Sequence, residues 1–561
     1  MQSPLDQIIE TNSEERMAEW YGRACREDIL ADEMEQEIAR LIGQNPSEDY
    51  EPVLGSVEAW QPFYHLSSMR KGLFYWYDFE EDASLLEVGA GFGALTGLFC
   101  DRCRMVVAAE ADDFRAKWLL KRYHCRENLC VYHGDLPEPG FTEIFPEKFD
   151  YIVVTDLLGE RFAGSGCREL YTGYLKKLAA LLKPSGHLLL AVDNRYGIRY
   201  FCGAPDPYTG RAFDGINRYP FGSSGYAFSR QELISIMEQA GLRWKLYYPL
   251  PDYRLVQLIY SDAYMQGSSI RERLVPYYTD SSGLVAYEKN LYDDLMENHV
   301  LHFFANAFLA ECTVQGDFCP VIYAALSTDR GKEHGFATTL RADGTAEKIC
   351  LDQAGIHSMK LILENSRQLA RQGIRVVEHH LSDHRLRMPW IKAPTLSNVL
   401  HACVFDHPEQ FHAWLDLLYE KILQSSEHVP DNQNFFLLKY GSSVEYGPVL
   451  KRALIDMVPI NCFCMENDLC FFDQEFARDD CPAGYVMYRT LIYTYMYLPK
   501  IEQAVPMETL KRRYRLEDAW QAYEQEEHAF IESNRNIQIY GQFYKWSEID
   551  PDCIYKKILG R

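Results

Sequence analysis

The sequence lacks the features that mark membrane-spanning chains and disulfide-bonded scaffolds. No apolar run approaches the ~20 residues of a membrane-spanning helix, and residues 1–20 are polar and acidic, without the apolar core of a signal peptide. The 16 cysteines are scattered, with neither disulfide-scaffold spacing nor paired zinc-ligand spacing. These absences predict a reduced, cytoplasmic protein without a transmembrane segment.

Basic residues are scarce relative to acidic ones. The chain carries 57 Lys and Arg against 81 Asp and Glu, which gives a formal net charge of −24 at pH 7. A surplus of that sign repels nucleic-acid phosphates, so we expect no nucleic-acid partner. Internal repeats and low-complexity tracts are also missing. A chain of 561 residues with 47% hydrophobic content can form roughly two to four domains with cores of their own.

What the sequence does have is a glycine-rich turn between a strand and a helix. Residues 84–93 read SLLEVGAGFG, so an apolar strand runs into three alternating glycines, and a helix-compatible run follows at 94–101. Such a turn lets the backbone approach a ligand closely and points free N–H groups at it. The spacing Gly89-x-Gly91-x-x-Ala94 also satisfies the dinucleotide fingerprint, so NAD and S-adenosylmethionine (SAM) are both candidates at this point.

Carboxylates follow the next two predicted strands. Glu110 comes directly after the apolar strand Met105 to Ala109, and Asp135 follows the strand Leu129 to Tyr132. The first carboxylate is placed to accept hydrogen bonds from both ribose hydroxyls of an adenosine, which NAD and SAM share. The second is placed to accept one from the adenine amino group, and this third strand favours SAM over NAD.

The ordered series, with further strands expected at 149–154 and 187–192, resembles the class I SAM-dependent methyltransferases. The resemblance covers about residues 57–315. It implies a Rossmann-like α/β domain with a mixed seven-stranded sheet. The residue pattern itself predicts a helical segment at 1–56 before this domain and a polar, largely helical insertion at 262–300. The resemblance also implies that the loop binds methionine while the two later carboxylates bind ribose and adenine. The SAM-binding residues carried over are Glu87, Gly89, Gly91, Gly93, Glu110 and Asp135.

Two residues after later strands are candidates for the methyl-transfer step. This step is an in-line displacement, so the protein must align a nucleophile and exclude water. Asp156 follows the fourth strand and could contact the cofactor amine or the acceptor, with a helix cap as the alternative. Arg195 follows the fifth strand and could hold an anionic acceptor bidentately, with a salt bridge to a neighbouring acid as the alternative.

A second group of polar residues lies in the C-terminal half, around a predicted hairpin. Asp456 and Asn461 flank a loop, and Asp473 closes the next strand. The hairpin is expected to bring Asn461 and Asp473 side by side, where amide and carboxylate oxygens suit Mg²⁺ that carries nucleotide phosphates. Asp456 is then free to accept a proton from an attacking hydroxyl. The alternative is that the two aspartates only cap turns beside an apolar hairpin.

Upstream of this group, Lys348 on a predicted strand and Glu364 on the following helix are candidates for an ion pair that positions phosphates. With Pro459 in the loop, and Asp473-Gln474-Glu475 after the hairpin, the region resembles protein-kinase-like phosphotransferases of the aminoglycoside and choline kinase branch. The resemblance implies an α+β bilobal domain at 316–561, with ATP and Mg²⁺ as ligands and Asp456 in phosphoryl transfer.

The region departs from that family at two places. Leu454 stands where the family has a histidine, and no glycine-rich phosphate loop is found near 326–335. These departures favour an alternative in which the kinase-like domain is inactive and serves as a binding or scaffolding module.

The order of the two domains is similar to that of bifunctional enzymes that terminate bacterial O-antigen chains with phosphate and methyl groups. That resemblance implies a methyltransferase of polysaccharide biosynthesis acting on a small-molecule or glycan acceptor. In the alternative with an inactive kinase-like domain, that domain would bind a glycosyltransferase or a sugar, and the protein would be peripheral to the membrane through such a partner.

Overall fold

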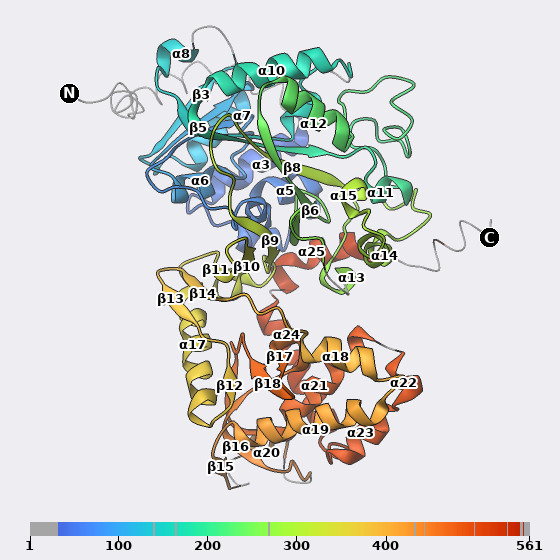
Figure 1. Cartoon of the computed structure of the whole chain (residues 1–561). Coiled ribbons are helices and arrows are strands. Elements are labelled where there is room, and N and C mark those ends of the chain that lie inside the picture. Colours follow the sequence, from blue (N-terminus) through green and yellow to red (C-terminus); the bar gives the residue numbers. More distant parts are fainter. Residues whose placement is uncertain are drawn as a thin grey trace. The chain divides into compact units, whose positions relative to one another are not determined.

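The computed structural model describes residues 32–549 and residue 554, apart from 138–140, 163–164, 267–269, 431–433, 442–443, 499 and 536. Residues 1–31 of the helical segment expected at 1–56 lie outside the described residues. The chain forms two compact units, residues 1–328 with 537–561 (unit 1) and residues 329–536 (unit 2), which Figure 1 colours along the sequence. Among the described helices, none combines the length and apolar character needed to cross a membrane.

A parallel sheet forms the centre of unit 1. Its order is β5-β4-β1-β2-β3. Every residue of β1 and β2 is buried, because helices and loops cover both faces of a parallel sheet. The bounds are β1 (Ser84–Val88), β2 (Met105–Glu110), β3 (Leu129–His133), β4 (Phe149–Thr155) and β5 (Leu182–Asp193).

Antiparallel strands extend this sheet beyond β5. β8 (Ala307–Thr313) pairs with β5, β6 (Arg243–Leu250) pairs with β8, and β7 (Leu258–Ser261) pairs with β6. β9 (Val321–Leu326) is added to β7. The mixed α/β sheet predicted from the sequence is confirmed, and β7 and β9 extend it beyond the seven strands expected.

The helices that follow these strands begin at polar caps. Asp112 caps α7 by accepting the Arg115 N–H, and Ser229 with Glu232 forms a capping box at α12. The insertion expected at 262–300 is not largely helical, since in its described residues the helices are short and polar loops separate them. The bounds are α6 (Thr96–Arg102), α7 (Asp113–Arg122), α8 (Phe141–Ile144), α9 (Leu157–Glu160), α10 (Arg168–Ala180), α11 (Ile198–Phe201), α12 (Arg230–Gln239), α13 (Ile270–Arg273), η2 (Glu288–Asn290), α14 (Tyr292–Glu297) and α15 (Leu301–Phe304).

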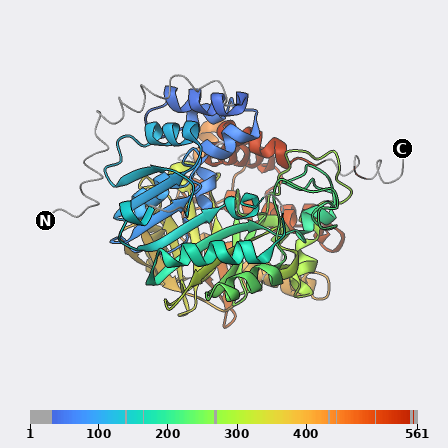
Figure 2. The same cartoon turned by 90° about the horizontal axis from the view of Figure 1, so that it is seen from above.

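The two ends of the described chain meet in one apolar cluster of unit 1. In Figure 2 the red C-terminal helix α25 lies beside the blue N-terminal helices. Their shared core contains Ile38, Phe63, Tyr540 and Phe543. The bounds are α3 (Glu33–Gln44), α4 (Glu51–Leu54), α5 (Trp60–Leu66), η1 (Ser68–Leu73) and α25 (Ile537–Ser547).

The division into units differs from the expected boundary between residues 315 and 316. β9 belongs to unit 1 because its backbone pairs with β7, and α25 belongs there because its apolar face packs in the N-terminal cluster. Short apolar segments of this kind carry no signal in the sequence that tells which core they join.

Unit 2 begins with strands and ends with helices, as expected for an α+β arrangement. β10 and β11 form the hairpin predicted at Asp343-Gly344, and Gly344 has a φ of 84° in its turn. β14 pairs with β11, and β13 with β14. The bounds are α16 (Gly331–His334), β10 (Phe336–Arg341), β11 (Thr345–Cys350), α17 (Gly355–Arg371), β12 (Arg375–Val376), β13 (His380–Ser382) and β14 (Arg385–Pro389).

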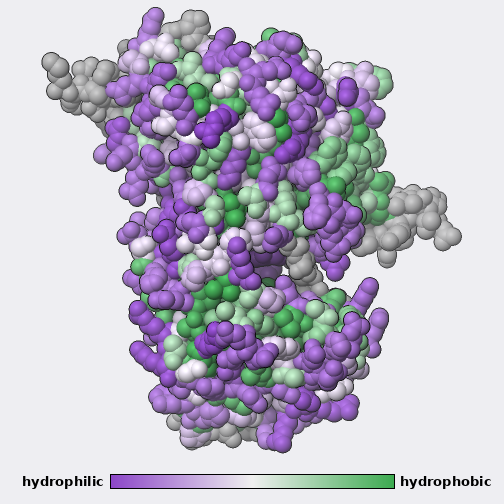
Figure 3. Space-filling view, in the orientation of Figure 1, coloured by the Kyte–Doolittle hydropathy of each residue, from purple (hydrophilic) through white to green (hydrophobic). Residues whose placement is uncertain are grey.

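The rest of unit 2 packs around a core of its own, which includes Leu415, Leu454, Phe471 and Tyr485. Two small sheets, β12-β18-β17 and β15-β16-β19, border it. The bounds are α18 (Leu396–Cys403), α19 (Pro408–Gln424), β15 (His428–Val429), α20 (Phe435–Tyr440), β16 (Val449–Leu454), η4 (Pro459–Asn461), β17 (Cys462–Met465), β18 (Asp468–Phe471), β19 (Ala477–Pro482), α21 (Ala483–Tyr497), α22 (Ile501–Ala504), α23 (Met507–Arg513) and α24 (Trp520–Asn534). In both units, hydrophilic side chains cover much of the face shown in Figure 3.

Candidate functional site

The glycine loop after β1 depends on glycine for its shape. Gly89, Gly91 and Gly93 have φ values of 77°, 57° and 80°, a region that side-chain-bearing residues rarely adopt. A Cβ on Gly93 would stand 2.4 Å from Leu119 and 2.6 Å from Tyr123, so this position has no room for a side chain. The loop is tied to β2, because the Gly89 N–H donates to the Ala109 carbonyl at 2.9 Å.

A cavity of about 710 Å³ opens beside this loop, at the carboxyl ends of the parallel strands. Open α/β sheets bind ligands at this edge, and the volume lies in the range of small-molecule sites. The structure brings most of the predicted SAM and methyl-transfer residues together in its lining, namely Glu87, Gly89, Gly91, Glu110, Asp135 and Asp156.

Glu110 connects the ends of β1 and β2. Its two carboxylate oxygens accept the N–H groups of Gly91 at 2.7 Å and of Asp112 at 2.9 Å. The side chain is therefore fixed across the glycine loop while it lines the cavity. Asp135 lies at the end of β3, where it is exposed and pairs with Arg161.

Glu87, the acid before the glycines, is buried beneath the loop. It accepts a hydrogen bond from the Thr96 hydroxyl at 2.6 Å. Burial raises the pKa of Glu87 to about 8, so the carboxyl is largely protonated at neutral pH. It can therefore donate as well as accept a hydrogen bond at the cavity wall.

Asp156 lies at the centre of a polar cluster at the end of β4. The hydroxyls of Tyr64 and Tyr253 donate to its carboxylate, and Arg70 Nη2 lies 3.1 Å from Oδ2. Burial raises the pKa of Asp156, but Arg254 and Arg70 outweigh burial and the net shift is downward. Although Asp156 precedes α9, its side chain makes no capping hydrogen bond, so Asp156 does not act as the side-chain cap of this helix. Its φ of 66° is uncommon for a non-glycine residue, and Asp156 lines the cavity.

Arg195 is not part of the cavity lining. Its guanidinium is buried, pairs with Glu232 at 2.7 Å and donates to the Tyr226 hydroxyl at 2.7 Å. The candidate role of holding an anionic acceptor therefore does not fit its position, and the salt-bridge alternative describes it. The capping-box glutamate of α12 supplies the partner.

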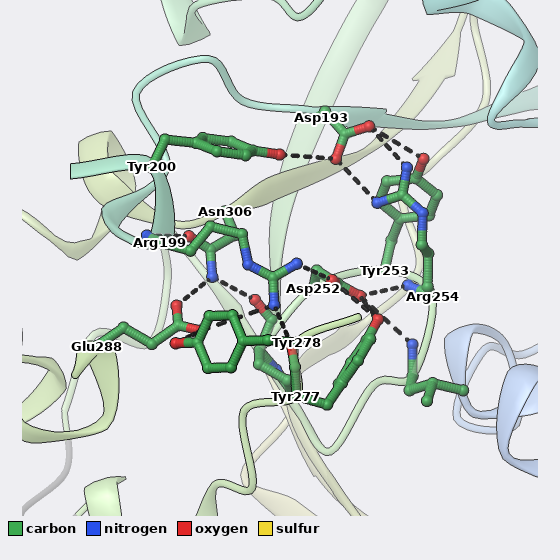
Figure 4. Close-up of polar contacts among 12 residues, drawn as sticks. Asp193, Arg199, Tyr200, Asp252, Tyr253, Arg254, Tyr277, Tyr278, Glu288 and Asn306 are labelled. Carbon is green, nitrogen blue, oxygen red and sulfur yellow. Dashed lines mark hydrogen bonds and ion pairs between the residues drawn. The ribbon is translucent and has the colours of Figure 1, made fainter. Parts of the chain in front are cut away.

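Among the arginines that line the cavity, Arg199 and Arg254 are held by buried carboxylates. Arg254 binds Asp193 through two hydrogen bonds of 2.9 Å, and Arg199 binds Asp252 at 2.5 Å (Figure 4). Tyr277 also donates to Asp252, at 2.8 Å. Around both arginines the sequence pattern predicts only a loop or a strand edge, so no local motif indicates that they line a cavity.

A buried layer behind these pairs holds Arg199 in place. Glu288 lies 3.6 Å from Arg199 Nη2 and accepts hydrogen bonds from the Tyr278 hydroxyl and the Asn306 amide, both at 2.7 Å (Figure 4). These buried hydrogen bonds and ion pairs hold the side chains of the cavity wall in place.

A column of stacked rings and cations forms another side of the cavity. The ring of Trp60 stacks between those of Tyr64 and Tyr277, with centroids 5.7 and 5.0 Å away. Arg70 lies over the outer face of the column at Tyr64, 5.0 Å from the centroid, and Arg199 over Tyr277 at 5.5 Å. All five residues line the cavity. The column therefore links the arginine that binds Asp156 to the one that binds Asp252.

Unit 2 brings several of the predicted nucleotide-site residues together. Lys348 on β11 donates to Asp473. The Asn461 amide donates to the Asp456 carbonyl at 3.2 Å, and the Phe472 N–H donates to the Asn461 carbonyl at 3.0 Å. The hairpin of β17 and β18 therefore places Asn461 next to the strand end that carries Asp473, as predicted.

Asp456 is a buried acceptor. Its carboxylate receives the N–H groups of Glu475 and Phe476 at 3.1 and 2.8 Å, and Arg489 Nη1 lies 3.2 Å away. Burial raises its pKa. Unlike Asp456, Glu364 is exposed on α17, and Lys348 pairs with Asp473 rather than with Glu364. The expected Lys348–Glu364 ion pair is therefore not formed, because Glu364 is exposed to solvent and Asp473 binds the Lys348 ammonium.

No cluster of three metal-ligating side chains is present among the residues that the structure describes. A second cavity, of about 580 Å³, lies in unit 2 and is lined by Gln368, Arg371, Lys451 and Arg452 among others. None of the predicted nucleotide-site residues lines it.

No family model and no curated protein matches the chain. Solved structures with similarity include a chain of the complex between the Haloferax volcanii Trm112 methyltransferase activator and a methyltransferase, at 11% identity and TM-score 0.28, covering 51% of this chain and 99% of that one. Another is an S-adenosylmethionine-dependent methyltransferase from Clostridium acetobutylicum, at 12% identity and TM-score 0.23, covering 31% and 78%. A third is Haemonchus contortus phosphoethanolamine N-methyltransferase 1, at 12% identity and TM-score 0.26, covering 39% and 45%. With similarities this low, we base the function on the geometry of the site.

Proposed function

We propose that unit 1 binds SAM and transfers its methyl group to an acceptor in the same cavity. The observation that carries this proposal is the position of Glu110, which is fixed across the glycine loop and lines the cavity beside it. A carboxylate at the end of the second strand is placed to accept ribose hydroxyls, and the left-handed glycines leave space for a ligand against the backbone.

The residues of the chain supply binding and orientation. The glycine loop with Glu87 faces the methionine portion, Glu110 the ribose and Asp135 the adenine. Bound SAM supplies an activated methyl group on a sulfonium. Asp156, held by two tyrosine hydroxyls and Arg70, is placed to fix the cofactor amine or the acceptor. Because its pKa is lowered, Asp156 is better suited to orient a positive or hydrogen-bonding group than to abstract a proton.

The acceptor is proposed to be an uncharged, hydroxyl-bearing molecule such as a sugar or other small glycan. Four arginines line the cavity, and each already pairs with a carboxylate: Arg70, Arg115, Arg199 and Arg254. An anionic acceptor would have to displace one of those partners, whereas a hydroxyl can bond to carboxylates and phenols in place. A role in polysaccharide biosynthesis, a glycosyltransferase partner and a membrane-peripheral location stay predictions from the sequence.

Calorimetry with SAM, S-adenosylhomocysteine and NAD tests the proposal. We expect binding of the first two and none of NAD. Glu110→Ala should weaken SAM binding by about 1–3 kcal/mol, because a ligand donor pair loses its acceptor. Glu147→Ala, an exposed glutamate outside the cavity lining, is the matched control and should bind as the wild type does. Binding of NAD without SAM would overturn the assignment.

A second candidate function concerns unit 2, and the Lys348–Asp473 pair favours it. We propose that this unit is a kinase-like domain that binds ATP with Mg²⁺, with Asn461 and Asp473 as the oxygen ligands and Lys348 next to the phosphates. The side chains are of the kind that Mg²⁺ prefers. Asp456 would face the acceptor hydroxyl in an active domain. In the alternative, an inactive scaffolding module, Asp456 only bonds the loop after β18.

Thermal shift with ATP and Mg²⁺ separates these readings. Asp473→Asn should remove an ATP-dependent shift that the wild type shows, while Asp468→Asn, an aspartate on the same hairpin, should keep it. A wild-type protein that responds to SAM but not to saturating ATP with Mg²⁺ would reject nucleotide binding by unit 2.

A further inference from the structure

The C-terminal helix α25 packs against the back of the cavity wall that α5 carries. Trp546 meets the rings of Trp60 and Phe63 edge-on, with centroids 5.4 and 5.2 Å apart, and Phe543 stacks on Phe63 at 6.4 Å. The hydroxyl of Tyr540 donates to Glu51 in α4 at 3.0 Å. In Figure 2 the red helix α25 lies beside the blue N-terminal helices.

The same helix holds the other segment of the aromatic column. The Tyr278 N–H donates to the Trp546 carbonyl at 2.9 Å, and the ring of Phe543 lies 6.1 Å from that of Tyr277. Tyr277 and Tyr278 line the cavity, whereas no residue of α25 does. One helix outside the cavity therefore contacts both segments that build the column, at Trp60 and at Tyr277.

The wall that α25 supports reaches the glycine loop. Arg122 Nη1 donates to the carbonyls of His65, at the end of α5, and of Phe92, in the loop, at 2.9 and 2.8 Å. The rings of His65 and Phe92 lie 5.3 Å apart, and a Cβ on Gly91 would stand 3.7 Å from His65 Cε1. The helix α5 thus lies over the turn that is proposed to hold the methionine portion of SAM.

We propose that Trp546 is a positioning residue for the SAM site. It acts from behind α5, by fixing Trp60 and the Tyr277–Tyr278 segment so that the column and His65 stay over the glycine loop. A binding wall is held only as precisely as the packing behind it allows. Cofactor affinity therefore depends on a helix that follows unit 2 in the sequence and touches no ligand. This inference rests on the proposed SAM binding by unit 1.

Calorimetry of the full-length chain with S-adenosylhomocysteine tests it. Trp546→Ala should raise the dissociation constant at least fivefold, and Trp546→Phe, which keeps an aromatic ring, should stay within twofold of the wild type. Lys545→Ala, at the exposed neighbouring position, is the matched control and should leave affinity unchanged. A folded Trp546→Ala variant that binds as the wild type does would overturn the inference.

A double-mutant cycle separates positioning from general destabilisation. If Trp546 acts through α5, then Trp546→Ala should cost less in a His65→Ala background than in the wild type. If the two substitutions raise the dissociation constant by independent factors that multiply, Trp546 does not act through α5.

The wild-type chain offers a test that needs no variant. Because coupling is reciprocal, S-adenosylhomocysteine should slow amide hydrogen exchange in residues 540–546, outside the cavity. Binding without this protection contradicts the inference alone, whereas absence of any binding by the wild type contradicts the proposed function itself.

Discussion

The candidate sites of the two units are built in different ways. In unit 1, backbone conformation makes the part of the site beside the glycine loop, because left-handed glycines and strand ends border a cavity of about 710 Å³ that paired side chains wall on its other sides. In unit 2, side-chain pairing dominates. Lys348 is bonded to Asp473, and Asp456 is bonded to two backbone N–H groups and lies beside Arg489.

This difference has a consequence for ligand binding. A cavity formed by backbone is present before a ligand arrives, so little rearrangement is required. A metal ion at Asp473 would instead compete with the ammonium of Lys348 for the same carboxylate. The glycine-loop side of the candidate site in unit 1 should therefore be the more sensitive to changes in backbone space, and the candidate site in unit 2 the more sensitive to changes in charge.

The largest effect is expected from Gly93→Ala in the glycine loop. The new Cβ would clash with Leu119 and Tyr123 at a φ of 80°, so unfolding should become easier by roughly 2–4 kcal/mol and SAM binding should be lost. Urea denaturation and calorimetry measure both. Gly241→Ala is a matched control with a φ of 81° and nothing within 4 Å, and it should cost only about 1 kcal/mol. Equal costs at the two positions would mean that space around the loop is not limiting.

The next effect concerns Asp456 in unit 2. Asp456→Ala should destabilise the chain by about 3 kcal/mol, because two N–H groups and the buried Arg489 lose their partner. Asp473→Ala, which removes the partner of Lys348 at a more exposed site, should cost less. Denaturation monitored by Tyr and Trp fluorescence compares the two. If each variant lowers the free energy of unfolding by less than ~0.5 kcal/mol, the side-chain pairs of Asp456 and Asp473 do not hold the candidate site of unit 2 together.

A smaller effect, with a defined pH dependence, is expected at Glu87. Its pKa is raised to about 8 from 4.5, so the folded state binds a proton that the unfolded state releases as pH rises above 4.5. The contribution of Glu87 to the free energy of unfolding is greatest below pH 4.5 and decreases as the pH rises towards 8. Glu87→Gln, which stays neutral, should therefore be more stable than the wild type at pH 8 by about 1–3 kcal/mol, and less so near pH 5. Melting curves across this range test it, and a constant difference would exclude titration of Glu87.

The sequence predicted those parts of unit 1 that depend on local patterns. The strands, the glycine loop and the carboxylates Glu110, Asp135 and Asp156 follow from apolar runs that end in glycine or acid, and the structure brings these residues into one cavity. Their assignment to SAM binding stays a proposal. Arg199, Arg254 and the aromatic column could not be predicted, because they come from short helices and loops far apart in the sequence that only long-range packing brings together.

Arg195 and α25 show two further limits. The position of Arg195 after a strand is typical of a ligand-binding residue. Its guanidinium instead pairs with Glu232, some 37 residues later, which also forms the capping box of α12. The apolar positions of α25 indicate a helix but not which core it joins, and only the three-dimensional structure shows that it packs with α4 and α5.

The smallest effect distinguishes the expected ion pair of unit 2 from the observed one. Because Glu364 is exposed on α17, Glu364→Ala should change stability and ATP affinity by less than ~0.5 kcal/mol. Lys348→Met should weaken ATP binding clearly, since the ammonium next to Asp473 is the cation available to phosphates at this strand. Thermal shift with and without ATP and Mg²⁺ measures both variants. A loss of ATP response in Glu364→Ala would show that the helix turns to bring Glu364 to Lys348 when nucleotide binds, and the unit 2 site would then depend on rearrangement rather than on the pairing seen here.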